Sequence, residues 1–148
     1  MKSFVIDTSV AVKWFVPEEY SNQAILLLEA EYDLLAPDLI FAEVGNTLWK
    51  KVQREEITST IAQEILQTLL SFPLHIYETR HLLESAFNIA HTTQRTVYDS
   101  IYLALANTFE CELVTADKKF FNALKDGSFS NNILWIENIY ATTLSQKT

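Results

Sequence analysis

The sequence predicts an α/β fold in which helices cover both faces of a mainly parallel sheet. Phe4, Val5 and Ile6 are adjacent apolar residues without polar ones between them, which is typical of a strand buried on both faces. Short apolar runs alternate with segments of helical periodicity along the chain. This alternation indicates a parallel sheet, because helices provide the crossover connections between parallel strands.

Periodicity, capping residues and prolines locate the individual elements. Asp38, Thr58 and Thr96 are the expected N-caps of three helices. We expect strands at residues 4–6, 34–36, 74–77, 112–117 and 133–136. We expect helices at residues 10–16, 20–32, 39–54, 59–71, 79–91, 97–109 and 118–124.

The composition is that of an ordinary globular protein. The chain has 148 residues, of which 49% are hydrophobic, so a core can form without a disulfide or a metal. Cys111 is the only cysteine, which excludes an intrachain disulfide and suits a reducing cytoplasm. No apolar stretch approaches the roughly 18 residues of a membrane span. We therefore expect a soluble cytoplasmic protein, with one domain over residues 1–140 and a polar tail over 141–148.

The formal charge of −8 argues against a protein that holds nucleic acid passively, because phosphate groups are bound by Lys and Arg. It does not exclude a nuclease whose acidic residues bind divalent cations. With two glycines, Gly45 and Gly127, the chain has no glycine-rich phosphate loop and no dinucleotide fingerprint. Its three histidines lack the spacing of a zinc pair on one helix.

Four acidic residues stand in apolar surroundings. Asp7 and Asp117 each come at the end of a predicted strand, where ligands bind in open α/β sheets. Glu43 borders the apolar stripe of a helix, and Asp99 lies in the first turn of a strongly apolar helix. Carboxylates near an interior need pairing, hydrogen bonds or a metal. Converging carboxylates would suit Mg²⁺ or Mn²⁺, which prefer oxygen ligands.

Each of these acids also has an ordinary structural interpretation. Asp7 and Asp117 would cap the turns or helices that follow them. Asp99 would complete a capping box with Thr96, and Glu43 would pair with a lysine on its own helix. Other acids, including Glu18, are interpreted as solvated side chains.

Four segments of the chain, taken in order, resemble the PIN domain family, and in particular its VapC-type toxin ribonucleases. They are residues 4–9 (FVIDTS), 37–46 (PDLIFAEVGN), 97–106 (VYDSIYLALA) and 113–120 (LVTADKKF). The resemblance implies a three-layer α/β/α fold. It also implies an acidic pocket that binds Mg²⁺ or Mn²⁺ and hydrolyses RNA phosphodiester bonds.

The resemblance assigns roles by position. The acidic quartet corresponds to Asp7, Glu43, Asp99 and Asp117. The three aspartates would hold the metal directly or through water, and Glu43 would orient the attacking water or take up its proton. Residues that support the site correspond to Ser9, Thr115 and Asn46. Basic residues that would contact RNA, or would be solvated helix ends, are Lys13, Lys50, Lys51, Arg54, Lys118 and Lys119.

The resemblance further implies a homodimer and a VapB-like antitoxin that blocks the groove. Trp14, Phe15 and Trp49 are candidate contact residues, with burial in the core as the alternative. Two other functions stay open. One is a PIN-like module that holds RNA or protein without cutting. The other is a Mg²⁺-dependent phosphohydrolase of the haloacid dehalogenase type, which is disfavoured because Ser9 stands where that chemistry needs a second aspartate.

Overall fold

The protein contains one parallel sheet. The structure is a computed structural model that describes residues 1–139, and the predicted tail at 141–148 lies outside the described residues. Five strands lie in the order β3-β2-β1-β4-β5, and each neighbouring pair is parallel, as predicted. The strands are β1 (Ser3–Ile6), β2 (Asp33–Pro37), β3 (His75–Tyr77), β4 (Glu112–Thr115) and β5 (Ile133–Trp135).

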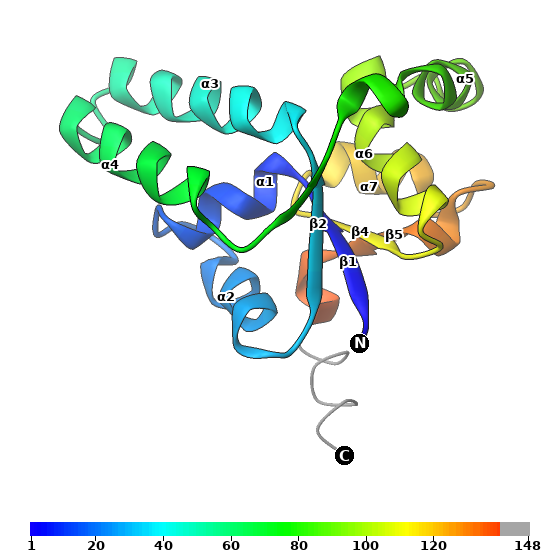
Figure 1. Cartoon of the computed structure of the whole chain (residues 1–148), viewed down its shortest axis with the longest axis horizontal. Coiled ribbons are helices and arrows are strands. Elements are labelled where there is room, and N and C mark those ends of the chain that lie inside the picture. The colour runs from blue at the N-terminus through cyan, green and yellow to red at the C-terminus, as the bar shows by residue number, and fades with distance from the viewer. Residues whose placement is uncertain (140–148) are drawn as a thin grey trace.

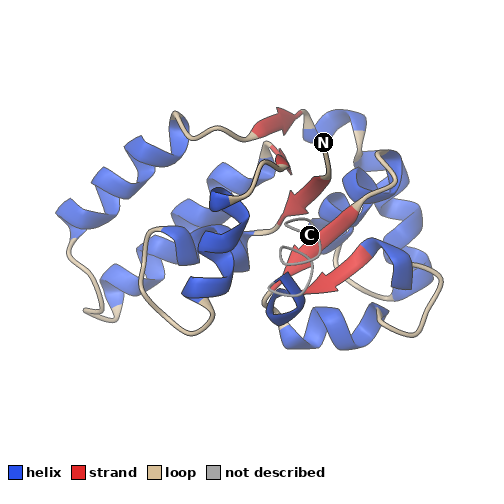
Figure 2. Ribbon diagram, turned by 90° about the horizontal axis from the view of Figure 1, so that it is seen from below, coloured by secondary structure: helices blue, strands red, loops and turns tan. Residues whose placement is uncertain are grey.

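Helices form the two outer layers. Figure 1 shows α1 to α4 on one side of the strands and α5 to α7 on the other, and Figure 2 shows the strands between helices. The α-helices of the described residues are α1 (Thr8–Ala11), α2 (Ser21–Glu29), α3 (Leu39–Gln53), α4 (Ser59–Leu70), α5 (Leu83–Thr93), α6 (Val97–Thr108) and α7 (Lys118–Leu124). Short 3₁₀ helices are η1 (Val12–Trp14), η2 (Thr79–His81), η3 (Ser130–Asn132) and η4 (Ile136–Asn138). The three layers confirm the predicted α/β/α sandwich.

The strand order reverses between β1 and β4. From β1 the chain proceeds to β2 and β3 in one direction, and it later continues from β4 to β5 in the other. The chain therefore leaves the carboxyl ends of these neighbouring strands toward opposite faces, which opens a crevice where such sheets bind ligands. Asp7 follows β1 directly and Asp117 lies just beyond β4. The fold places both residues at this crevice.

The core is centred on β1 and α6. Phe4, Val5 and Ile6 are completely buried, and Val5 lies between Leu35 of β2 and Leu113 of β4. On α6, every residue from Ser100 to Ala106 is buried. This unbroken run follows from the position of α6, which packs against β1, β2 and β4 and also against α5.

Several predicted helices have different boundaries in the structure. The helix predicted over 20–32 ends earlier, at Glu29. The helix predicted over 10–16 is divided into α1 and η1 and begins earlier, at Thr8, because the Asp7 side chain caps it by accepting a hydrogen bond from the Val10 N–H. The helix predicted over 79–91 is divided into η2 and α5. The latter ends at Thr93, where Gln94 adopts a left-handed conformation with φ 58°.

The capping predictions were correct for Thr58 and Thr96, whose hydroxyls accept backbone N–H groups of α4 and α6. Asp38 occupies the N-cap position of α3, as predicted, but its carboxylate makes no cap bond to this helix. The carboxylate instead accepts the N–H of Thr79 at 3.0 Å. This bond ties the start of α3 to the segment that follows β3. No helix in residues 1–139 has the length and apolar character that a membrane crossing requires.

Leu105→Ala should lower the free energy of unfolding by about 2 to 5 kcal/mol, because a fully buried side chain of α6 would be replaced by a cavity. Asn107→Ala, at an exposed position of the same helix, should change it by less than about 0.5 kcal/mol. Urea denaturation measures both values. Equal costs for the two variants would contradict the central position of α6.

Candidate active site

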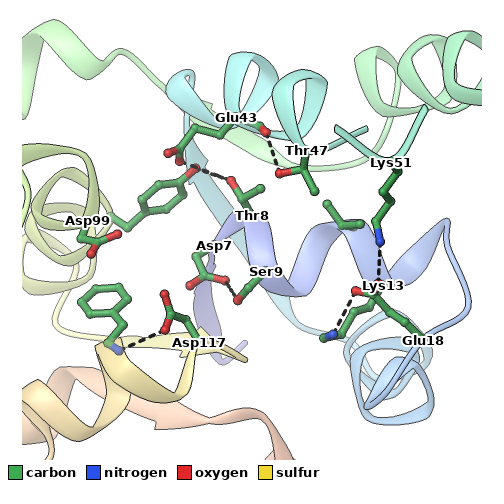
Figure 3. A pocket seen from close by; sticks show the side chains of 13 residues that line it. Asp7, Thr8, Ser9, Lys13, Glu18, Glu43, Thr47, Lys51, Asp99 and Asp117 are labelled. Carbon is green, nitrogen blue, oxygen red and sulfur yellow. Dashed lines mark hydrogen bonds and ion pairs between the residues drawn. The ribbon is translucent and has the colours of Figure 1, made fainter. Parts of the chain in front are cut away.

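One pocket brings together the four acidic residues predicted from the sequence. It has a volume of about 360 Å³ and is lined by Asp7, Glu43, Asp99 and Asp117. These residues come from the start of α1, from α3, from the first turn of α6 and from the start of α7. Figure 3 shows their side chains around a common space. The other lining residues are Thr8, Ser9, Val12, Lys13, Glu18, Thr47, Lys51, Tyr102 and Phe120.

Asp7 is the most enclosed of the four acids, with 6% of its surface exposed. Ser9 donates a hydrogen bond to its Oδ1, and Thr115 donates one to its Oδ2, both at 2.6 Å. The same two hydroxyls accept backbone N–H groups, Ser9 from Ala116 at 2.9 Å and Thr115 from Asp117 at 3.0 Å. Asp7 thus joins the end of β1 to the loop between β4 and α7.

Burial raises the pKa of Asp7 from its ordinary 3.8 to about 6, because removal from water disfavours the charged carboxylate. The hydrogen bonds from Ser9, Thr115 and the Val10 N–H oppose this rise, and the nearby negative charge of Asp117 adds to it. The hydrogen bonds therefore only partly compensate for the burial of this charge.

Glu43 is held at the opposite side of the pocket by a short chain of hydroxyl groups. Thr8 donates a hydrogen bond to Oε1 of Glu43 at 3.3 Å, and the oxygens of Thr8 and Tyr102 lie 3.0 Å apart. Either hydroxyl can donate in the hydrogen bond between Thr8 and Tyr102, so Tyr102, Thr8 and Glu43 form one hydrogen-bonded chain. Burial, together with the negative charges of Glu43 and Asp7, raises the pKa of Tyr102, which keeps its hydroxyl protonated.

Asp99 forms an ion pair with an arginine that the sequence analysis did not single out. Arg95 donates from Nη2 to Oδ2 of Asp99 at 2.9 Å, and its guanidinium lies 5.4 Å from the centre of the Phe120 ring. The Thr96 hydroxyl accepts the Asp99 N–H at 3.0 Å, as the capping-box interpretation predicted, so Asp99 takes part both in the start of α6 and in the ion pair with Arg95. Burial raises the pKa of Asp99, Arg95 opposes the rise, and Asp117 adds to it. A cation at this carboxylate would compete with Arg95.

Asp117 is close enough to two other acids of the pocket, Asp7 and Asp99, for its negative charge to act on both. Its Oδ1 accepts the Phe120 N–H at 3.2 Å, so it caps α7 as the ordinary interpretation predicted. Its charge nevertheless raises the pKa of both Asp7 and Asp99. Capping α7 and lining the acidic pocket are thus compatible, and the three aspartates share one electrostatic neighbourhood.

The donor chemistry of the pocket fits a hard divalent cation. Carboxylate oxygens are the ligands that Mg²⁺ and Mn²⁺ prefer, and a cation would offset the burial and the charge repulsion that raise the pKa values of Asp7 and Asp99. Within residues 1–139, however, no three Asp, Glu, His or Cys side chains are gathered into a ready-made metal group. The four carboxylates therefore share a pocket without forming a closed coordination shell.

The remaining predicted site residues divide between the pocket and its surroundings. Lys13 and Lys51 line the acidic pocket. Asn46 and Lys50 line an adjoining hollow, which also includes Thr8 and Glu43. Lys118 lies away from the pocket, with its ammonium group 4.6 Å from the centre of the Trp135 ring.

The remaining candidates are two basic residues predicted to contact RNA and three aromatic residues predicted to contact a partner protein. Arg54 and Lys119 are exposed and line neither the pocket nor the adjoining hollow. Trp14 and Phe15 pack against Phe72, with ring centres 5.0 and 5.3 Å away, so the alternative of core packing is correct for both. Trp49 has 56% of its surface exposed.

Several residues that face the pocket were not predicted as site residues. Glu18 was interpreted as a solvated side chain, and it is exposed, but it also lines the pocket between Lys13 and Lys51. Tyr102 was assigned only to an apolar helix face. Its spacing of three residues from Asp99, and that of four residues between Arg95 and Asp99, place these groups on one side of a helix and could have indicated both.

The layers and the pocket define an α/β protein with four carboxylates at the switch point of its sheet. Residues 4–125 of the chain match the PIN domain family. Ribonuclease VapC3 of Pyrobaculum aerophilum is 34% identical over 117 residues, which cover 78% of this chain and 89% of that protein. The chain therefore belongs to the PIN domain family and is a relative of its VapC-type ribonucleases.

Solved structures agree with this fold. The crystal structure of PAE2754 from Pyrobaculum aerophilum has a TM-score of 0.73 at 21% identity, covering 98% of this chain and 91% of that one. A chain of a toxin–antitoxin complex from Klebsiella pneumoniae has a TM-score of 0.59 at 18% identity, covering 88% of this chain and 94% of that one.

Without divalent cations, Asp7→Asn should be more stable than the wild type at pH 7. The folded-state pKa of Asp7, about 6, exceeds 3.8, so its contribution to stability is present below about pH 4 and lost as the pH rises through 6. The loss corresponds to about 3 kcal/mol. Urea unfolding measures the free energy of unfolding of both proteins from pH 4 to 8. The difference between the two free energies should grow from near zero at pH 4 to this value at pH 8.

The exposed Asp126 offers a matched control, and Asp126→Asn should show no comparable change with pH. Equal stabilities of Asp7→Asn and the wild type at pH 8 would contradict the uncompensated charge at Asp7.

Proposed function

We propose that the chain is a divalent-metal-dependent endoribonuclease that acts as the toxin of a toxin–antitoxin pair. The observation that carries this proposal is the convergence of four acids, from four separate elements, on one pocket of a PIN-family fold. The relative named as a ribonuclease, at 34% identity, supports RNA as the substrate. An RNA substrate also supports the cytoplasm as the place of action.

Asp7, Asp99 and Asp117 are proposed to hold Mg²⁺ or Mn²⁺. They share an electrostatic neighbourhood in which negative charge is not compensated, as the raised pKa values of Asp7 and Asp99 indicate. When bound, the cation would supply Lewis-acid polarisation of the phosphate and easier deprotonation of water. Ser9 and Thr115 keep both oxygens of Asp7 in one orientation, which preserves the position of this ligand.

Glu43 is proposed to orient the attacking water and to accept its proton. It lines the same pocket as the three aspartates, and Thr8 holds one of its oxygens. A carboxylate fixed in this way is suited to general base catalysis, because the proton acceptor must lie within hydrogen-bonding reach of the water. The water oxygen attacks phosphorus, the phosphodiester P–O bond opposite it breaks, and the leaving oxygen of the strand takes up a proton from the surrounding water.

Two other functions would require a different residue at the site or give a different result with RNA. A phosphohydrolase of the haloacid dehalogenase type would need an aspartate at position 9, where Ser9 donates a hydrogen bond to Asp7. A silent binding module would bind RNA without cutting it. The presence of all four acids in the pocket supports the nuclease over both.

An antitoxin of the VapB type and a second copy of the chain are the proposed partners. The structural likeness to a chain of a toxin–antitoxin complex supports the first. Exposed apolar side chains, including Trp49 on α3 and Phe87 on α5, are the proposed contacts.

The purified protein should cleave labelled RNA with Mg²⁺ or Mn²⁺ and stop on addition of EDTA. Asp7→Asn and Asp99→Asn should each reduce cleavage by at least about 100-fold, because each removes a negative ligand from the pocket. Mn²⁺ should raise the unfolding temperature of the wild type more than that of Asp7→Asn.

Glu29→Gln, which removes an exposed acid on α2, is the matched control and should retain full cleavage. Full activity of Asp99→Asn would refute the assignment of the site. RNA binding without any cleavage by the wild type would favour the silent module.

Tyr102→Phe should lower kcat by about tenfold with little change in KM, because it removes the hydroxyl that orients Thr8 and, through it, Glu43. Steady-state cleavage assays measure both constants. Tyr77→Phe, which removes a hydroxyl on β3 outside the pocket, should leave kcat unchanged. An unchanged kcat in Tyr102→Phe would show that Glu43 does not depend on this chain of hydroxyl groups.

A further inference from the structure

Two lysines and a glutamate line the acidic pocket on the side away from the aspartates. Figure 3 shows Lys13, Glu18 and Lys51 together at this side. The Lys13 ammonium lies 3.0 Å from Oε1 of Glu18, and the Lys51 ammonium lies 3.0 Å from its Oε2. The three residues come from η1, from the loop before α2 and from α3. One carboxylate therefore bridges two cations from different elements.

These lysines differ from ordinary surface lysines in their burial. Their side chains are only 11% and 16% exposed, although each belongs to the lining of an open pocket. Burial alone would lower the pKa of Lys51, but Glu18 and Glu56 hold it above its ordinary value. Burial would likewise raise the pKa of Glu18, but the two lysines hold it below its ordinary value. Lys51 and Glu18 are therefore charged.

The lysines keep hydrogen-bonding capacity for a further anion. An ammonium group has three hydrogens. Lys13 uses one of them on Glu18, and Lys51 uses one on Glu18 and one on Glu56. The two lysines balance the charges of Glu18 and Glu56, which leaves this side of the pocket less negative than the side with the aspartates.

We propose that Lys13 and Lys51, bridged by Glu18, form a binding site for a phosphate group of the RNA strand adjacent to the phosphate that is cut. This proposal rests on the proposed function. A single strand carries one phosphate per nucleotide, and a pocket of about 360 Å³ is large enough for a segment of this size. The site explains how a chain with a net charge of −8 holds RNA, because its cations are gathered where the strand is cut.

Other basic residues do not offer the same arrangement. Lys118 lies over aromatic rings outside the pocket, and Lys50 lines the adjoining hollow. Among the described residues that line the pocket, Lys13 and Lys51 are the only basic ones. Glu18 contacts both ammonium groups and offsets part of their positive charge before RNA binds.

The test measures the salt dependence of RNA binding. A fluorescent single-stranded RNA is titrated with the full chain carrying Asp99→Asn, which prevents cleavage, in Mg²⁺ at several salt concentrations. Lys13→Met and Lys51→Met should each reduce the slope of log affinity against log salt by about 0.7, because each loses a phosphate contact. Lys125→Met, an equal charge change at an exposed position on α7's end, should leave the slope unchanged.

Further variants distinguish the effect of losing a positive charge from the effect of losing the folded structure. Lys51→Arg should keep the slope that Lys51→Met loses, and urea denaturation should show that both variants fold. Glu18→Gln should keep or raise RNA affinity, because it removes an anion and leaves both cations. A fall in affinity in Glu18→Gln as large as that in the lysine variants would overturn the proposal.

Cleavage assays without the Asp99 substitution separate this proposal from the proposed function. Lys13→Met and Lys51→Met should raise KM with little change in kcat. Slopes equal to that of Lys125→Met, in a protein that still cleaves RNA, would overturn the phosphate site alone. Lysine-dependent binding in a wild type that never cleaves RNA would support the phosphate site and overturn the nuclease. A wild type that neither binds nor cleaves RNA would overturn both.

Discussion

The site depends on one buried negative charge, the carboxylate of Asp7, which lies between the ends of β1 and β4. Asp7 is buried at the point where the chain leaves two neighbouring strands toward opposite faces, and hydroxyl groups from both sides satisfy its two oxygens. Ser9 and Thr115 also accept backbone N–H groups of the β4–α7 loop, so the carboxylate holds the two strand ends together. The same burial raises its pKa to about 6, which shows that hydrogen bonds alone do not offset the charge. A structural role in the crevice and an uncompensated negative charge arise from one cause.

Charge is distributed unevenly around the pocket. Three aspartates repel one another at the crevice, Glu43 is held opposite by Thr8, and two lysines stand at the far side around Glu18. Arg95 is a cation already present among the acids, where it pairs with Asp99. This arrangement explains why the overall negative charge does not argue against an RNA substrate. The net charge averages over the surface, whereas binding depends on the charges at the place where the strand lies.

Prediction from sequence succeeded where local chemistry dominates and failed where distant segments meet. Thr58 and Thr96 cap helices through bonds within three residues, so their roles are visible in the sequence. Asp38 has the same local pattern, yet its carboxylate binds Thr79, which lies 41 residues away. The ion pair between Glu18 and Lys51 was not predicted for the same reason, because the two residues approach each other only when α3 packs beside η1. They lie 33 positions apart in the sequence.

By itself, the sequence determined the class of fold and the identity of the four acids. Periodicity and strand-end carboxylates depend on neighbouring residues, and a parallel sheet brings its strand ends to one edge. Only the tertiary structure decided that Ser9 and Thr115 share one carboxylate, that Asp99 pairs with Arg95, and that Tyr102 reaches Thr8. These contacts depend on side-chain positions that follow from packing between elements, mostly between residues far apart in the chain. A pattern of residue types cannot specify such positions, because the same types at the same spacing pair differently when the packing around them changes.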